Sequence, residues 1–174
     1  ISGIHAGMAE RKSGCRIGHW RSSPEWIPDI ASQFRDDGNG RGPLMKDKYP
    51  SAQTFSFGDS PQMADALLAL ILAGTKTATC GALRDFPAGS TDMPVVGRRD
   101  VVLDGKGGRA AVIETLEVTI RRFDEVDEAF AHDEGEGFRN LADWRKGHQE
   151  YFERNGGFAP DMELVCERFR LVEA

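Results

Sequence analysis

The chain lacks the features that mark disulfide-rich, secreted and membrane proteins. Its 174 residues include only three cysteines, Cys15, Cys80 and Cys166, and no two of them form a CxxC pair. This excludes a disulfide framework and favours reduced thiols. The longest mainly apolar run, residues 64–73, contains Asp65 and is far shorter than the roughly 20 residues that span a bilayer. The first 20 residues contain no apolar segment of the secretory type. We therefore expect a cytoplasmic protein with no membrane partner.

An excess of positive charge is also missing. Aspartate and glutamate total 28 against 22 lysines and arginines, so the net charge is −6. A long anionic backbone is disfavoured as the main ligand, although a local basic patch stays open. The four histidines show no metal-ligand spacing along the sequence. We therefore expect no metal and no other cofactor.

Several common catalytic motifs are absent. The sequence has no G-x-S-x-G elbow and no G-x-G-x-x-G after a predicted strand. A phosphate-binding P-loop needs glycine directly before its lysine, and Thr75 occupies that position before Lys76. Residues 132–134 match the first half of the zinc-deaminase signature, but no P-C-x-x-C follows. These absences exclude the best-known serine hydrolase, nucleotide-binding and zinc deaminase sites.

The composition is that of one globular domain, with 40% hydrophobic and 29% charged residues. Residues 1–44 differ from the rest, because glycine is frequent and apolar periodicity is poor. One helix is predicted there, capped by Ser23 and followed by Pro24. The segment is either a real N-terminal helix or a leader translated upstream of Met45. We therefore divide the chain into an extension, 1–44, and a domain, 45–174.

From Phe55 onward the sequence predicts alternating short elements. Strands are expected at 55–57, 75–83, 99–103, 109–123 and 162–172, and helices at 61–73, 124–132 and 141–155. A glycine-rich turn at 104–108 joins two of the strands as a hairpin. This order favours an α+β fold, a mixed β-barrel of about five strands with flanking helices, over a doubly wound sheet.

The strand at 109–123 carries a charge on an apolar face. Residues of one parity there are Val112, Glu114, Leu116, Val118 and Ile120. Because strand side chains alternate between faces, all of them are expected on one side of the sheet. Glu114 is then the lone carboxylate among apolar neighbours, and it becomes a candidate site residue.

The segment Gly74-Thr75-Lys76-Thr77-Ala78-Thr79-Cys80-Gly81 offers a lysine and a hydroxyl without histidine or metal. A lysine beside a hydroxyl is one way to generate a nucleophile. In a regular strand Lys76 and Thr79 would point to opposite faces, so they can meet only if the chain is irregular after Gly74 or the lysine stem curls over the edge. The carboxylate could come from Glu114 or from Glu134 or Glu136 in a glycine-rich loop. An ordinary strand start with a solvated lysine, and an acidic loop before a helix, are the alternatives.

Six separated motifs resemble one known family. They are Phe57-Gly58-Asp59, Ala64-Asp65-Ala66-Leu67, Gly74-Thr75-Lys76-Thr77-Ala78-Thr79, Glu134-Gly135-Glu136-Gly137, Trp144-Arg145-x-x-His148 and Cys166-Glu167-Arg168-Phe169. Together, in this order, they resemble the ASCH domain (activating signal cointegrator homology), a relative of the PUA RNA-binding barrel. The resemblance covers residues 55–172, and residues 1–44 have no counterpart beyond the predicted helix.

The resemblance implies a particular chemistry. Small bacterial members of the family are similar to N4-acetylcytidine amidohydrolases, whose lysine, threonine and glutamate fall on Lys76, Thr79 and Glu136. Substrate contacts are then expected from six further residues: Phe57, Cys80, Gly81, Glu114, Glu134 and Trp144. Where small amidohydrolases have a bulky residue and an arginine, this chain has Cys80-Gly81. The specificity of the site is therefore left open.

We expect a metal-independent amidohydrolase that removes acyl groups from N4 of cytidine and related nucleosides. Its partner would be a small modified pyrimidine nucleoside. The resemblance leaves open two alternatives: a ribonuclease or PUA-like RNA-binding protein, which would use Arg98-Arg99, Arg121-Arg122 and Arg168/Arg170, and a scaffold domain without catalysis. It also leaves open whether Thr79 attacks directly or through a water, and whether the protein forms a homodimer.

Overall fold

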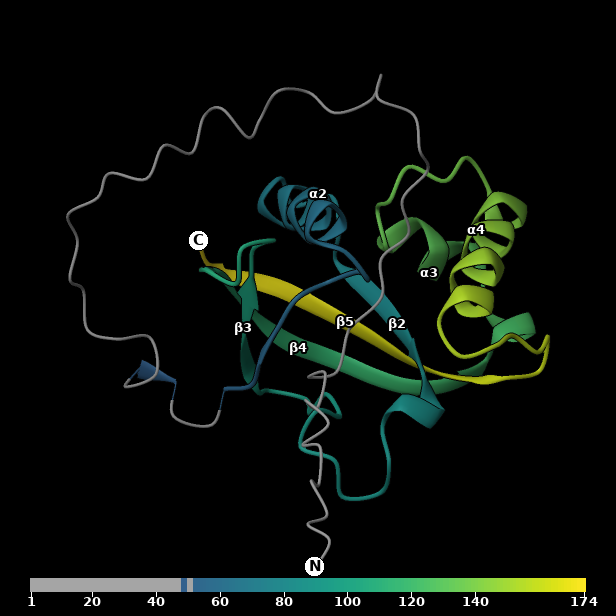
Figure 1. Ribbon diagram of the computed structural model, residues 1–174, viewed down its shortest axis with the longest axis horizontal. Coiled ribbons are helices and arrows are strands. Elements are labelled where there is room, and N and C mark those ends of the chain that lie inside the picture. Colours follow the sequence, from purple (N-terminus) through teal and green to yellow (C-terminus); the bar gives the residue numbers. More distant parts are fainter. Residues whose placement is uncertain (1–47, 50–51) are drawn as a thin grey trace, which may run out of the picture.

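The computed structural model describes residues 48–49 and 52–174, and Figure 1 shows their arrangement. The helix predicted near Ser23 lies outside the described residues. The described elements are β1 (Thr54–Phe55), α2 (Pro61–Leu72), β2 (Ala78–Ala82), η2 (Leu83–Asp85), β3 (Arg99–Leu103), β4 (Arg109–Arg122), η3 (Phe123–Glu125), α3 (Glu128–Asp133), α4 (Leu141–Arg154) and β5 (Glu163–Glu173). The predicted α+β class is confirmed.

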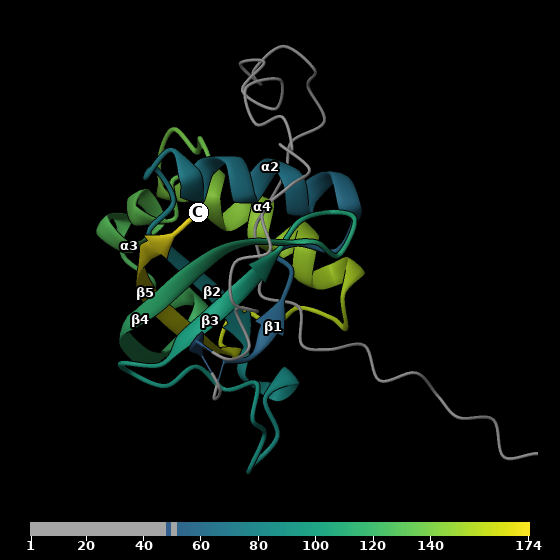
Figure 2. The ribbon, with the colours of Figure 1, turned by 90° about the vertical axis from the view of Figure 1, so that its left-hand side faces the viewer.

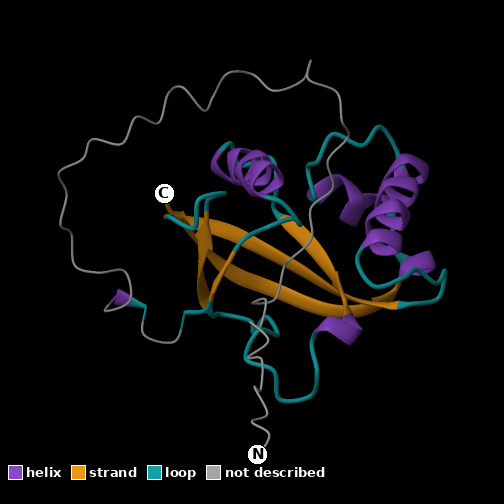
Figure 3. Cartoon of the chain, in the orientation of Figure 1, coloured by secondary structure: helices purple, strands orange, loops and turns teal. Residues whose placement is uncertain are grey.

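All five strands belong to one mixed sheet in the order β1-β3-β4-β5-β2. Strands β1 and β3 run parallel, and the other neighbouring pairs are antiparallel. The long central strands β4 and β5 cross the middle of the molecule in Figure 3. The sheet is mixed and has five strands, as predicted, but it is open, because the edge strands β1 and β2 do not pair with each other.

Helix α2 follows from clear local signals. The Ser60 hydroxyl accepts a hydrogen bond from Met63 N at 3.2 Å, and Pro61 takes the first helical position. Its apolar residues recur at helical spacing, and five are buried: Met63, Ala64, Leu67, Leu68 and Ile71. The helix ends before Gly74, whose φ of 73° lies in the left-handed region.

The two faces of the sheet carry different cores. Helix α2 packs with Phe57, Ile113 and Phe169 on one face. Helices α3 and α4 pack with Cys80, Cys166 and other residues of β2 and β5 on the opposite face. Figure 2 shows α2 lying across the sheet, with α4 behind it. Because Cys166 and Phe169 differ in parity along β5, they point to opposite sides. Strand β2, at the sheet edge, therefore borders both cores.

Strand β4 departs from the predicted alternation. Its pairing with β5 shifts register between Thr115 and Glu117, so Leu116 is an extra residue at a β-bulge. Glu114 is paired with Arg170 and Glu117 with Arg168, and these two arginines share one face of β5. The expectation that one parity holds from Val112 to Ile120 is therefore wrong. After the bulge, odd-numbered residues of β4 point to the side of the sheet to which even-numbered residues point before it.

Two other boundaries differ from prediction. Strand β2 begins at Ala78, three residues later than expected, because the backbone amides of residues 75–77 donate to Leu70 and Asp133 and not to a neighbouring strand. Helix α3 begins at Glu128, because Asp127 caps it by accepting from Phe130 N at 2.8 Å. Among the described residues, none of the helices has the length and apolar character needed to cross a membrane.

Candidate active site

The chain between α2 and β2 is irregular, and this irregularity positions Lys76. The backbone amides of Thr75 and Lys76 both donate to the carbonyl of Leu70, at 2.9 and 3.1 Å. Thr77 N then donates to Asp133 O at 2.8 Å. Lys76 is therefore free of strand alternation. The sequence predicted that Lys76 and Thr79 could lie on the same side if the chain were irregular after Gly74, and the chain is irregular there.

The loop after α3 lies directly against this segment. Gly135 has a φ of 66°, and a Cβ added to it would lie 2.1 Å from the carbonyl oxygen of Thr75. Only a residue without a side chain allows this approach. The close contact explains how the loop carries Glu136 to Lys76 across 60 residues of sequence.

Lys76 and Glu136 form a buried ion pair. The lysine Nζ and the carboxylate Oε1 are 2.5 Å apart, and both side chains are 0% exposed. The Nζ also lies 5.6 Å from the centroid of the Phe57 ring. Burial raises the pKa of Glu136 above its ordinary value, although the charge of Lys76 acts in the opposite direction. The sequence named three candidate carboxylates, and Glu136 is the one paired with Lys76.

Thr79 faces the same side of the sheet as this pair. It lies opposite Glu167 in the β2–β5 register, and Glu167 shares its face with Phe169. The Phe169 and Phe57 rings are 5.9 Å apart, and Phe57 lies beneath the Lys76 Nζ. Thr79 is 2% exposed. The lysine, the threonine and the α2 core therefore share one face.

Glu167 is a buried carboxylate beside Thr79 that the sequence reading did not assign to the site. It is 1% exposed and accepts a 2.6 Å hydrogen bond from the hydroxyl of Thr115. The available signal was a charged residue in the middle of the strand, between the apolar residues Val165 and Phe169 of the same parity.

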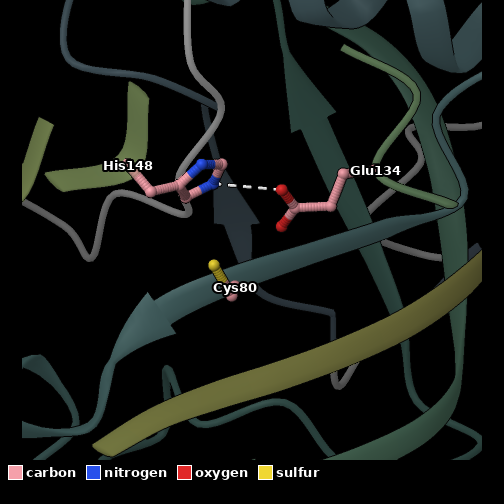
Figure 4. A group of neighbouring side chains, drawn as sticks. All are labelled: Cys80, Glu134 and His148. Atoms are coloured by element: carbon pink, nitrogen blue, oxygen red, sulfur yellow. Dashed lines mark ion pairs between the residues drawn. The ribbon is translucent and has the colours of Figure 1, made fainter. Parts of the chain in front are cut away.

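Glu134 lies on the other face of β2, with His148 of α4 and Cys80 (Figure 4). One oxygen, Oε2, accepts from Trp144 Nε1 at 2.5 Å and lies 3.0 Å from His148 Nε2. Burial acts to raise the pKa of the Glu134 carboxyl, but His148, Lys76 and Trp144 together hold it below its ordinary value. Burial also raises the pKa of the Cys80 thiol well above its usual range. His148 belongs to one of the six sequence motifs, but the sequence alone predicts no role for it.

The space around Trp144 and Gly81 is occupied by other residues of the protein. The Trp144 ring stacks on His148 at 4.0 Å and on Phe123 at 5.4 Å, so both of its faces are occupied. Gly81 packs against the Phe86 ring, which an added Cβ would approach to 2.9 Å. We therefore do not include Trp144 or Gly81 among the residues that would contact a substrate.

Glu114 lies apart from the lysine. It pairs with Arg99 at 2.9 Å and with Arg170 at 3.0 Å. These hydrogen bonds, first the one from Arg99, lower the pKa of the Glu114 carboxyl. The β-bulge explains this placement, because Glu114 shares a face with Arg170 and not with the α2 core. Its role is explained by these ion pairs.

If the protein has the amidohydrolase activity that the resemblance implies, Glu114→Gln should keep its turnover within roughly twofold of the unaltered protein, since exposed ion pairs contribute little. Steady-state turnover of N4-acetylcytidine would measure this. A loss comparable to that of Glu136→Gln would instead return Glu114 to the active site.

The family model of the ASCH domain matches residues 53–173. The chain belongs to the ASCH domain family. Two crystal structures resemble this ASCH domain. One is the ASCH domain from Lactobacillus crispatus JV V101, at 32% identity and a TM-score of 0.66, covering 76% of this chain and 87% of that one. The other is a protein from Enterococcus faecalis V583, at 33% identity and a TM-score of 0.65, covering 74% of this chain and 83% of that one. The family predicted from the six motifs is confirmed.

No curated protein matches this ASCH chain. The family match nevertheless relates the domain to the PUA-like RNA-binding fold. It covers the segments that carry Lys76, Thr79 and Glu136, so the whole candidate site lies within the ASCH domain.

Proposed function

We propose that this ASCH protein hydrolyses the amide that joins an acyl group to N4 of cytidine or a related nucleoside. The observation that carries the proposal is the buried Lys76–Glu136 pair, at 2.5 Å, on the same side of the sheet as Thr79. An acid–base pair on the same side of the sheet as a hydroxyl supplies the three groups that acyl transfer needs, a proton donor, a proton acceptor and a nucleophile. The remaining support is the resemblance to N4-acetylcytidine amidohydrolases.

The mechanism starts from the form of the pair in which Glu136 carries the proton, which the raised pKa of this carboxyl favours. When Glu136 takes the proton, Lys76 is a neutral amine and can accept the hydroxyl proton of Thr79. The Thr79 oxygen then forms a bond to the acyl carbon, and the carbonyl oxygen becomes an oxyanion. As the intermediate collapses, the bond between carbon and N4 breaks and Glu136 gives its proton to N4. The products of this half are the free cytosine amine and an acyl ester on Thr79.

Water completes the reaction. A water attacks the ester carbon and gives one proton to Glu136. Lys76 returns its extra proton to the Thr79 oxygen as the ester bond breaks. The products are cytidine and the carboxylic acid, and the pair regains its initial protonation. The same groups could instead activate a water directly, and only the route through Thr79 forms a covalent intermediate.

The oxyanion would be stabilised by a backbone amide of β2. Phe169 N donates to Thr77 O, so Thr77 occupies a hydrogen-bonding position opposite Phe169, although its own N–H bonds to Asp133. Because such positions alternate in an antiparallel ladder, Thr79 and Gly81 bond to β5, and the N–H of Cys80 points away from it. The amide directly after the nucleophile is then the natural donor.

The proposal is tested by incubating the purified protein with N4-acetylcytidine and measuring cytidine and acetate. We expect hydrolysis without added metal. Thr79→Ala should lose more than about a hundredfold in turnover, whereas Thr79→Ser keeps the hydroxyl and should retain a measurable fraction. Thr77→Ala is the matched control, because Thr77 lies in the same segment but is exposed. Equal turnover in Thr79→Ala and Thr77→Ala would contradict a role for Thr79.

RNA binding is the alternative, and the structure gives it less support. The six arginines that could form a basic patch, at 98, 99, 121, 122, 168 and 170, each pair with a carboxylate. Such pairing reduces the positive potential offered to phosphates. A salt-sensitive shift of labelled RNA, with no release of acetate from the nucleoside, would favour this alternative over hydrolysis.

A further inference from the structure

Three side chains with metal-binding atoms meet on the face of β2 opposite Thr79. They are Cys80 of β2, Glu134 after α3 and His148 of α4 (Figure 4). One ligating atom from each lies within 4.8 Å of those of the others, and all three residues are 0% exposed. They come from three elements far apart in sequence, so spacing along the chain could not reveal the group.

The histidine is oriented as metal-binding histidines usually are. Its Nδ1 lies 3.1 Å from the carbonyl oxygen of Trp144, which can only accept, so Nδ1 carries the hydrogen. In the neutral ring the lone pair then sits on Nε2, which faces Glu134. A ligating histidine characteristically donates its other N–H to a backbone carbonyl or a carboxylate.

One carboxylate oxygen of Glu134 lacks a hydrogen-bond partner among the described residues. Trp144 Nε1 donates to Oε2, whereas Oε1 is buried and has no hydrogen-bond partner within the described part of the chain. A buried polar atom without a hydrogen-bond partner is unfavourable, because it has lost its contact with water and gained nothing in exchange. A cation would satisfy it, while Trp144 holds the carboxylate in place from outside the group.

We propose that Cys80, Glu134 and His148 bind one Zn²⁺ ion. The cysteine sulfur, the histidine Nε2 and the glutamate carboxylate supply the three ligand types that zinc takes in proteins. Calcium and magnesium prefer oxygen ligands, so a set with sulfur and nitrogen disfavours them. A thiolate and a carboxylate together balance the charge of Zn²⁺, which is required in a site without solvent exposure. Binding would release the thiol proton to solvent.

The ion would fix the geometry of the active site without taking part in hydrolysis. Cys80 directly follows Thr79, and Glu134 precedes Glu136 by two residues. Zinc bonded to both Cys80 and Glu134 would hold β2 and the loop that carries Glu136 in a fixed relative position. Because Cys80 and Thr79 point to opposite faces of β2, the metal lies on the far side of the strand from the attacking hydroxyl.

The test uses the full chain, expressed with zinc in the medium and freed of any affinity tag. Elemental analysis should find roughly one zinc ion per chain. After exchange, cobalt(II) should give a thiolate-to-metal charge-transfer band in the near ultraviolet. Cys80→Ser and His148→Gln should each reduce bound zinc at least about tenfold. Cys166→Ser is the matched control, since Cys166 is a buried thiol opposite Cys80 that lies outside the three-residue group.

The melting temperature provides a second readout. Adding zinc to chelator-treated protein should raise the melting temperature of the unaltered chain and of Cys166→Ser, but not that of Cys80→Ser. If Cys80→Ser does not fold, the cobalt spectrum of the unaltered chain decides. Less than about a tenth of a zinc ion per chain, together with no cobalt–thiolate band, would overturn the proposal. Equal metal loss in Cys166→Ser would overturn the assignment to Cys80.

Discussion

Lys76→Ala should reduce the turnover of N4-acetylcytidine by more than about a hundredfold. The variant removes the amine that takes the Thr79 proton, and it leaves Glu136 buried without its counter-charge. Lys76→Arg is the sharper test. Arginine can keep the ion pair with Glu136, but its guanidinium does not give up its proton in proteins. It should therefore be as inactive as Lys76→Ala if the lysine transfers a proton.

Folding and catalysis are separated by a double variant. Removing one member of a buried ion pair costs roughly 3–5 kcal/mol, whereas replacing both members with apolar residues can be neutral. Lys76→Met combined with Glu136→Leu should therefore unfold at a higher urea concentration than Lys76→Met alone, and remain inactive. Lys106→Ala serves as the surface control, because Lys106 is exposed in the β3–β4 turn. Full turnover in Lys76→Arg would exclude the proposed proton transfer.

Gly135→Ala should be the most damaging of the small substitutions in the loop. The added methyl group would lie 2.1 Å from Thr75 O, and the backbone φ of 66° disfavours a side chain. Left-handed backbone costs about 1–2 kcal/mol, and displacing a packed neighbour costs roughly 1–3 kcal/mol more. The loop would have to move away from Lys76, so turnover should fall together with the free energy of unfolding.

Gly137→Ala is the matched control for this prediction. Gly137 has a φ of 80°, but an added Cβ would meet no atom of the described chain within 4 Å. This variant should show only the backbone cost of about 1–2 kcal/mol. Urea unfolding of both variants measures the difference. Equal decreases in the free energy of unfolding at the two positions would show that the contact with Thr75 does not contribute to stability.

Local signals predicted the regular parts of the fold well. Ser60, Pro61 and an apolar stripe define α2, and β3 has the predicted bounds, residues 99–103. The bulge at Leu116 could not be predicted, because nothing in the residue pattern separates a regular strand from one with an extra residue. That single irregularity misplaced Glu114.

The candidate site was predictable only in part. The resemblance selected Glu136 from three carboxylates, whereas the residues alone left the choice open. The structure supplies the physical reason, since Gly135 lets the loop contact the segment before β2. The environments of His148 and Glu167 depend on pairing between distant elements, and a linear pattern does not contain that information.

The extra residue in β4 also constrains how this protein can diverge. Leu116 is 49% exposed, so many side chains should be acceptable at that position. Deleting it would turn one half of the strand over, and either Ile113 would leave the α2 core or Val118 would lose its place beside Glu167. Natural drift should therefore change the identity of this residue freely while preserving the number of residues between the two halves.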